Sequence, residues 1–128
     1  MDLPAYFDSA RGRGVLATAD GHGRVDQAVF ARPHTLEDGT LAFIMPDRRT
    51  HRNLLSNPHA AYLFMEDGPG YKGVRLFLSQ VKEEEDADRI SLIRRRDYAG
   101  QPGGDDPRYL VIFRVDHVLP LVGAEWDA

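Results

Sequence analysis

Short apolar runs, each bounded by a turn rich in glycine or proline, recur along the chain and constrain its fold more than any other sequence feature. The turns include "DGHG", "EDG" and "DGPG", and apolar and polar residues alternate over 24–36. Alternation with a period of two indicates a strand with two different faces. The pattern predicts about six or seven strands. They are expected over residues 14–20, 24–36, 40–45, 59–66, 74–85 and 108–123, and the last range is expected to form a strand, a bend near Asp116–His117 and a final short strand.

Asp38-Gly39, between the strands expected at 24–36 and 40–45, is the strongest hairpin signal in the chain. Strands connected mostly by tight turns favour an antiparallel barrel or sandwich. We therefore expect a mainly β fold with a few short helices inserted between strands.

Three segments have the character of helices. Residues 4–11 are expected to form a short N-terminal helix. A second helix is expected to begin at Asp47 as N-cap, to turn Leu54 and Leu55 inward, and to end before Pro58. A third is expected over 86–96, where Ile90 and Ile93 share one face.

Composition narrows the class of protein. The chain has 128 residues and no internal repeat or linker, so we expect a single domain over residues 1–128. It has no cysteine, which excludes disulfides and thiolate metal sites. The N-terminal stretch lacks the pattern of a secretory signal, and no apolar run is long enough to span a bilayer. We expect a cytoplasmic protein that binds neither membrane nor, at a net charge of −4, nucleic acid.

A cluster of basic residues interrupts this acidic sequence at an expected strand-to-helix junction. Arg48, Arg49 and Arg52 lie within five residues of each other, together with Thr50 and Asn53. A helix N-terminus offers backbone N–H groups, arginine offers a planar pair of donors, and threonine offers a hydroxyl. The combination fits a phosphate group; the alternative is an ordinary solvated turn, with Asn53 stitching the turn together.

The same region resembles the split-barrel flavoproteins of the pyridoxamine 5'-phosphate oxidase-like superfamily. The likeness rests on the strand "LAFIM", the turn "PDRRT", the order Asn53, Leu54, Asn57, Pro58 in the helix, and the strand "HAAYLF". It implies a Greek-key-like split β-barrel of six to seven antiparallel strands. It also implies that Arg49 and Thr50 hold the phosphate of FMN, and that the strand "QAVFAR" runs along the isoalloxazine ring.

The residues that this resemblance places at the cofactor come from three segments. The strand along the ring contributes Val29, Phe30, Ala31 and Arg32, and Met45 and Pro46 border the ribityl chain. The phosphate turn contributes Arg48, Arg49, Thr50 and Asn53. No catalytic residue is assigned, and the five histidines do not have metal-ligand spacing, so no metal site is expected.

The departures from the family decide between functions. The ring strand has only Arg32 where oxidases of the family carry an arginine and a lysine, and the substrate-phosphate residues near the oxidase C-terminus are missing. A true pyridoxamine 5'-phosphate oxidase is therefore not expected. We expect an FMN-dependent oxidoreductase or electron-transfer protein. The alternative is a non-catalytic module of the same fold that binds haem, a deazaflavin or another nucleotide.

The resemblance also implies a homodimer in which both chains contact each flavin. Apolar segments such as "HAAYLFM" and "YLVIFRV" would then be covered by the partner. Residues 99–107 and the C-terminal "AEWDA" are candidates to close over the site, and Trp126 is a candidate to stack on a ring.

Overall fold

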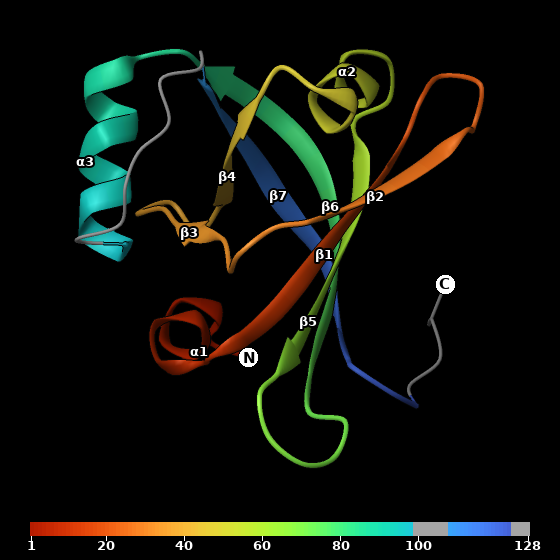
Figure 1. Cartoon of the computed structure of the whole chain (residues 1–128), viewed down its shortest axis with the longest axis vertical. Coiled ribbons are helices and arrows are strands. Elements are labelled where there is room, and N and C mark those ends of the chain that lie inside the picture. The colour runs from red at the N-terminus through yellow and green to blue at the C-terminus, as the bar shows by residue number, and fades with distance from the viewer. Residues whose placement is uncertain (99–107, 124–128) are drawn as a thin grey trace.

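The computed structural model describes residues 1–98 and 108–123, so the expectations for 99–107 and Trp126 lie outside the described residues. Within these described residues, three short helices are combined with seven strands (Figure 1). The elements in chain order are α1 (Leu3–Ser9), β1 (Gly12–Ala19), β2 (Val25–Val29), β3 (His34–Thr35), β4 (Leu41–Pro46), α2 (Arg49–Ser56), β5 (His59–Glu66), β6 (Gly73–Glu84), α3 (Ala87–Asp97) and β7 (Arg108–Pro120).

All seven strands belong to one antiparallel sheet with the order β2-β1-β5-β6-β7-β4-β3. Tight turns join β1 to β2, β3 to β4 and β5 to β6, as expected for hairpins. Helix α2 connects β4 to β5 in the chain. These two strands are not neighbours in the sheet, because β6 and β7 lie between them. The prediction of a mainly β, antiparallel fold with six to seven strands is confirmed.

The strand expected over 24–36 is instead two strands with a break between them. β2 ends at Val29, and β3 comprises only His34 and Thr35. Pro33 lies in the break, and its lack of a backbone N–H removes a donor that a continuous strand would need. The chain can therefore leave the pairing with β1 and turn toward β4.

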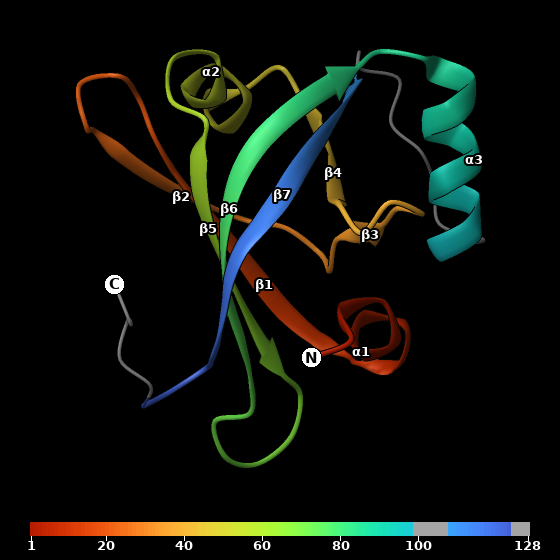
Figure 2. The ribbon, with the colours of Figure 1, turned by 180° about the vertical axis from the view of Figure 1, so that it is seen from behind.

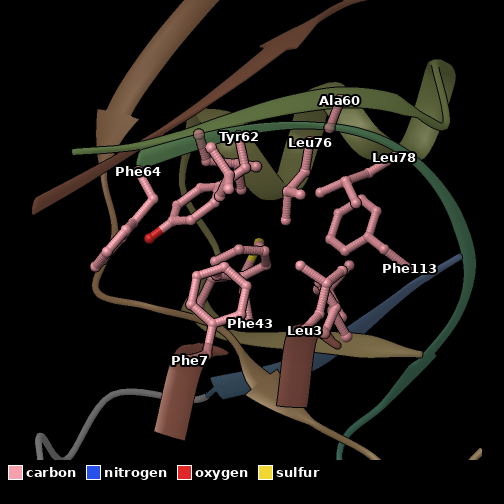
Figure 3. Packing of buried hydrophobic residues seen from close by; sticks show 14 of the residues in the cluster. Leu3, Phe7, Phe43, Ala60, Tyr62, Phe64, Leu76, Leu78 and Phe113 are labelled. Carbon is pink, nitrogen blue, oxygen red and sulfur yellow. The ribbon is translucent and has the colours of Figure 1, made fainter. Parts of the chain in front are cut away.

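Aliphatic and aromatic side chains fill the concave side of the sheet, where helix α1 closes the core (Figure 3). Leu3 and Phe7 of α1 point at the same space as Phe43 of β4 and Tyr62 of β5. The rings of Phe7 and Phe64 meet edge to face with centroids 5.5 Å apart. Such contacts add to the free energy gained from burying the ring surfaces.

A second, smaller apolar cluster lies under helix α3. Ile90 and Ile93 are buried against Ala42, Leu110 and Ile112 of β4 and β7, which confirms the helical face predicted for the two isoleucines. Both views show α3 alongside β3 and β4 (Figure 1, Figure 2). The helix thus covers one end of the sheet on the side away from the main core.

Candidate functional site

The basic turn lies at the start of helix α2, but the helix begins one residue later than expected. Its N-cap residue is Arg48, so the prediction of Asp47 as N-cap is wrong. The carboxylate of Asp47 is bound instead by the ring of His51, with Oδ1 2.8 Å from Nδ1. This contact between residues four apart draws the carboxylate away from the backbone N–H groups that a cap would accept from.

The first turn of α2 has no side-chain cap, unlike the other two helices of the described residues. Asp2 accepts a hydrogen bond of 3.1 Å from the backbone N–H of Ala5 at the start of α1. Asp86 does the same for two N–H groups of α3. A helix start without an acidic cap keeps backbone donors and the positive end of the helix dipole available to an external anion.

Side chains of this turn fall into a buried and an exposed group. Arg48, Arg49 and Arg52 are exposed, whereas Thr50 is buried, with only 6% of its surface accessible, and so is Asn53. The amide Nδ2 of Asn53 donates a hydrogen bond of 3.0 Å to the hydroxyl of Thr18 in β1. Asn53 therefore links α2 to the sheet. This is the structural role that the sequence allowed as the alternative to a phosphate contact.

Of the two leucines expected to face inward, only one does. Leu54 is buried in the main core, but Leu55 is 69% exposed. Adjacent residues of a helix point about 100° apart, so a helix lying on the sheet by one narrow face buries only one of them.

His51 is a buried histidine held between two carboxylates. No specific role was predicted for this residue from the sequence. Its Nδ1 lies 2.8 Å from Asp47 and its Nε2 lies 2.7 Å from Oε2 of Glu83 in β6. Its ring stacks on Tyr109 of β7, with centroids 4.0 Å apart. Burial lowers the pKa of His51, but the two carboxylates outweigh burial and raise it above its ordinary value.

The network around His51 orients the basic turn. It ties the first turn of α2 to β6 and β7, and it engages the negative charge of Asp47 that would otherwise oppose an anion at the turn. Arg52 also lies near this carboxylate, with Nε 3.7 Å from Oδ1. A signal was present in the sequence, because Asp47 and His51 have i, i+4 spacing. Glu83 is too distant in sequence to be anticipated.

The segment expected along the flavin ring contains both exposed and anchored residues. Val29 is 82% exposed at the end of β2, and Ala31 is exposed. Phe30 is partly buried and packs edge to face on Phe43 at 5.7 Å. Arg32 donates a hydrogen bond of 2.9 Å from Nη1 to the carbonyl of Ala10. The segment thus presents Val29 and Ala31 outward, while Phe30 and Arg32 hold it in place.

The two residues that precede the turn differ in what they offer. Met45 is 1% exposed and its side chain lies in the main core, so only its backbone can border a ligand. Pro46 is partly exposed, and its carbonyl accepts the N–H of Arg48 at 2.9 Å. Helix α2 contacts both β1 and β2, so the fold brings the basic turn and the expected ring strand to neighbouring elements (Figure 1).

Residues 1–98 and 108–123 contain no cluster of three or more side chains suited to holding a metal ion. No helix among them combines the length and apolar character needed to cross a membrane.

No protein-family model matches the sequence, and no curated protein matches it either. Solved structures do match. An FMN-binding protein from Syntrophomonas wolfei subsp. wolfei superposes with a TM-score of 0.74 at 16% identity, over 94% of this chain and 84% of that one. An F420 reductase gives a TM-score of 0.73 at 18% identity, over 93% and 97% of the two chains.

A third match is a protein from Listeria innocua assigned as a pyridoxamine 5'-phosphate oxidase, with a TM-score of 0.63 and 22% identity. The match covers 94% of this chain and 96% of that one. At such identities the likeness establishes the architecture. The chain has the split-barrel fold of the FMN-binding and pyridoxamine 5'-phosphate oxidase-like proteins.

Proposed function

We propose that this chain binds FMN, with the phosphate at the first turn of α2 and the ring along residues 29–32. The observation that carries the proposal is the start of α2, where Arg48 stands at the N-cap position that an aspartate occupies in the other described helices. Arg48, Arg49 and Arg52 are exposed at this helix start, where no side chain caps the backbone N–H groups. A dianionic phosphate matches that arrangement in both charge and hydrogen-bonding capacity.

The structural neighbours support a cofactor of this chemical type. One is an FMN-binding protein, and another is an F420 reductase, whose name points to a deazaflavin. Both cofactors combine a flat tricyclic ring with a phosphate. A deazaflavin is therefore the second candidate, and the same turn would hold its phosphate.

Bound FMN would supply hydride or electron transfer, so we further propose an oxidoreductase or electron-transfer role. The chain's own contribution is to hold and orient the cofactor. Arg49 and the backbone of the first turn would bind phosphate, and Val29 and Ala31 would lie against the ring. His51 is a positioning residue, because it fixes the turn through Asp47 and Glu83.

We also propose that the protein is a homodimer. Val29, Val15, Leu63, Arg75 and Leu119 follow one another in register across five strands, on the face opposite the main core. Four of these five side chains are apolar, and the next residue outward on β5, Met65, is exposed. Pairing this face with its copy would cover it and would place a second chain beside β2.

An absorption spectrum of the purified protein, followed by titration of FMN into the apoprotein, tests the cofactor proposal. We expect flavin bands near those of free FMN, shifted by binding, and one FMN per chain at saturation. A deazaflavin would absorb at shorter wavelength than FMN. Protein that is colourless and takes up neither FMN nor a deazaflavin would exclude both candidates.

A further inference from the structure

A cavity of about 160 Å³ opens where the chain leaves β2 and turns toward β3. It lies between residues 30–34, strand β4, helix α3 and the start of β7. Helix α2 does not line it. The cavity is therefore distinct from the basic turn at Arg48–Asn53.

The walls of this cavity carry an excess of positive charge. Arg32, Arg94 and Arg108 line it, and no carboxylate residue is among its described lining residues. His34 also lines it, but burial lowers its pKa and its Nδ1 is paired with the carboxylate of Asp97. Three guanidinium groups around one small space favour an anionic occupant.

Arg108 provides a separate observation that points to a ligand. Its Nε is buried and is the one buried side-chain polar atom among the described residues without a hydrogen-bond partner. Arg108 starts β7 beside Pro46 and lies on the same face as Leu110, which packs under α3. Buried donors are nearly always paired, so an acceptor within the cavity is expected.

The remaining walls are aromatic. Phe30 and Phe43 meet edge to face at 5.7 Å, and Tyr98 stands on the other side with the guanidinium of Arg32 5.7 Å from its ring centroid. The hydroxyl of Tyr98 donates to the carbonyl of Arg32 at 2.7 Å, which holds this wall in place. An apolar cavity of about 150 Å³ admits benzene. The volume here thus fits a single six-membered ring with a small substituent.

We propose that this cavity binds a one-ring aromatic carboxylate, with the ring between Phe30, Phe43 and Tyr98 and the carboxylate on Arg108 and Arg94. Arginine meets both oxygens of a carboxylate in one plane, and the aromatic walls select a flat ring. Binding itself is independent of the cofactor. The further step, that such a molecule is the substrate because Ala31 lines this cavity and would also lie against the flavin ring, rests on the proposed function.

Calorimetric titration of the full chain with three probes tests binding without any flavin. Benzoate carries ring and charge, benzyl alcohol the ring alone, and acetate the charge alone. We expect benzoate to bind more tightly than either by about tenfold or more, since only benzoate makes both kinds of contact. Equal binding of acetate and benzoate would overturn the aromatic part, and failure of benzoate to bind would overturn the whole proposal.

Arg108→Met keeps an unbranched apolar side chain and removes the guanidinium, so it should weaken benzoate by about tenfold or more. Arg95→Met is the matched control, because Arg95 is exposed on α3 and does not line the cavity. If Arg108→Met fails to fold, Arg94→Met provides the same comparison, because Arg94 lines the cavity and is adjacent in sequence to the control residue Arg95. Equal benzoate affinity in the cavity variants and the control would refute the assignment.

A second readout separates the binding site from its link to the cofactor. In protein loaded with FMN, benzoate should shift the flavin absorption bands, and Arg108→Met should abolish the shift at the same benzoate concentration. Calorimetric binding without a spectral shift would leave the cavity as an anion site and overturn its role as a substrate site. Lack of FMN binding would overturn the proposed function while the calorimetric result stands.

Discussion

The hydroxyl of Tyr62 in β5 donates a hydrogen bond of 3.0 Å to the carbonyl oxygen of Phe30, one residue past the end of β2. The backbone N–H of Phe30 in turn donates to the carbonyl of Gly14 at 3.0 Å. Tyr62 is 1% exposed, so its hydroxyl makes this bond from within the core. The backbone N–H and the backbone carbonyl of Phe30 are therefore both hydrogen-bonded, although the residue lies beyond the end of β2.

Tyr62→Phe should destabilise the protein by about 1–3 kcal/mol, because the ring stays but the carbonyl of Phe30 loses a buried donor. Chemical denaturation measures the change in the free energy of unfolding. Tyr71→Phe is the control, since Tyr71 is 78% exposed, and it should change stability by less than about 0.5 kcal/mol. Equal effects of the two substitutions would show that the hydrogen bond contributes nothing.

Gly14→Ala should disturb the same contact by steric means. A Cβ at this position would lie 2.6 Å from the carbonyl oxygen of Phe30 and would overlap the Tyr62 hydroxyl. We expect a loss of about 1–3 kcal/mol in the free energy of unfolding, as for other overpacked sites. Gly21→Ala is the control, because its Cβ would meet nothing closer than 3.5 Å. A neutral Gly14→Ala would mean that the sheet yields there at no cost.

The double substitution Arg49→Ala, Thr50→Ala should weaken FMN by about 2–4 kcal/mol, given the usual strength of hydrogen bonds to charged groups. Riboflavin has the same ring but no phosphate, so its affinity should change far less. Fluorescence titration of both ligands measures the two losses. Arg24→Ala, at an exposed arginine of the β1–β2 turn, is the control. Equal losses for FMN and riboflavin would contradict the phosphate assignment.

Val15→Asp should dissociate the proposed dimer, because it places a charge between Val29 and Leu63, its two apolar neighbours in the row that runs from Val29 to Leu119. Sedimentation velocity distinguishes the dimer from the monomer. Leu92→Asp is the matched control, since Leu92 is 61% exposed on α3, which packs over Ala42, Leu110 and Ile112 and not over the row. A wild-type protein that sediments as a monomer while retaining one FMN per chain would remove the dimer proposal.

His51→Gln should lower stability more at pH 5.5 than at pH 8.5. The carboxylates of Asp47 and Glu83 raise the pKa of His51 above its unfolded value of 6.5. The charged ring therefore stabilises the fold fully below pH 6.5, and this contribution is lost as the pH rises through the higher folded-state pKa. Denaturation of both proteins at the two pH values measures the difference. The exposed His22 offers His22→Gln as a control.

If the cost of His51→Gln is the same at both pH values, the ion pairs of His51 do not stabilise the fold. If the cost grows toward high pH, the sign of its pKa shift is wrong.

The architecture could be predicted from local patterns, whereas the contacts that hold the candidate site could not. Asp38-Gly39 marks a turn, and the spacing of Ile90 and Ile93 marks a helix face, since both signals lie within a few residues. Glu83 reaches His51 across 32 residues, and Tyr62 reaches Phe30 across the same separation. Such pairings depend on strand order, which a single sequence does not contain.

The errors at α2 had a local physical cause. Asp47 is a favourable N-cap residue by type, yet a histidine four residues later competes for its carboxylate. Leu55 is apolar, but it follows Leu54 on a helix that rests on the sheet by a narrow face. In both cases a nearby residue in the helix, His51 or Leu54, takes the contact that the residue type of Asp47 or Leu55 would favour.

The first turn of α2 has no side-chain cap. An anion that binds there only in the folded state would shift the whole folding equilibrium toward the folded chain. A ligand present at one hundred times its dissociation constant adds about 2.7 kcal/mol to the free energy of unfolding. That is a sizeable part of the roughly 5–15 kcal/mol typical of a domain. The amount of intact protein in a cell would then rise and fall with the supply of cofactor, since unliganded chains would be degraded first.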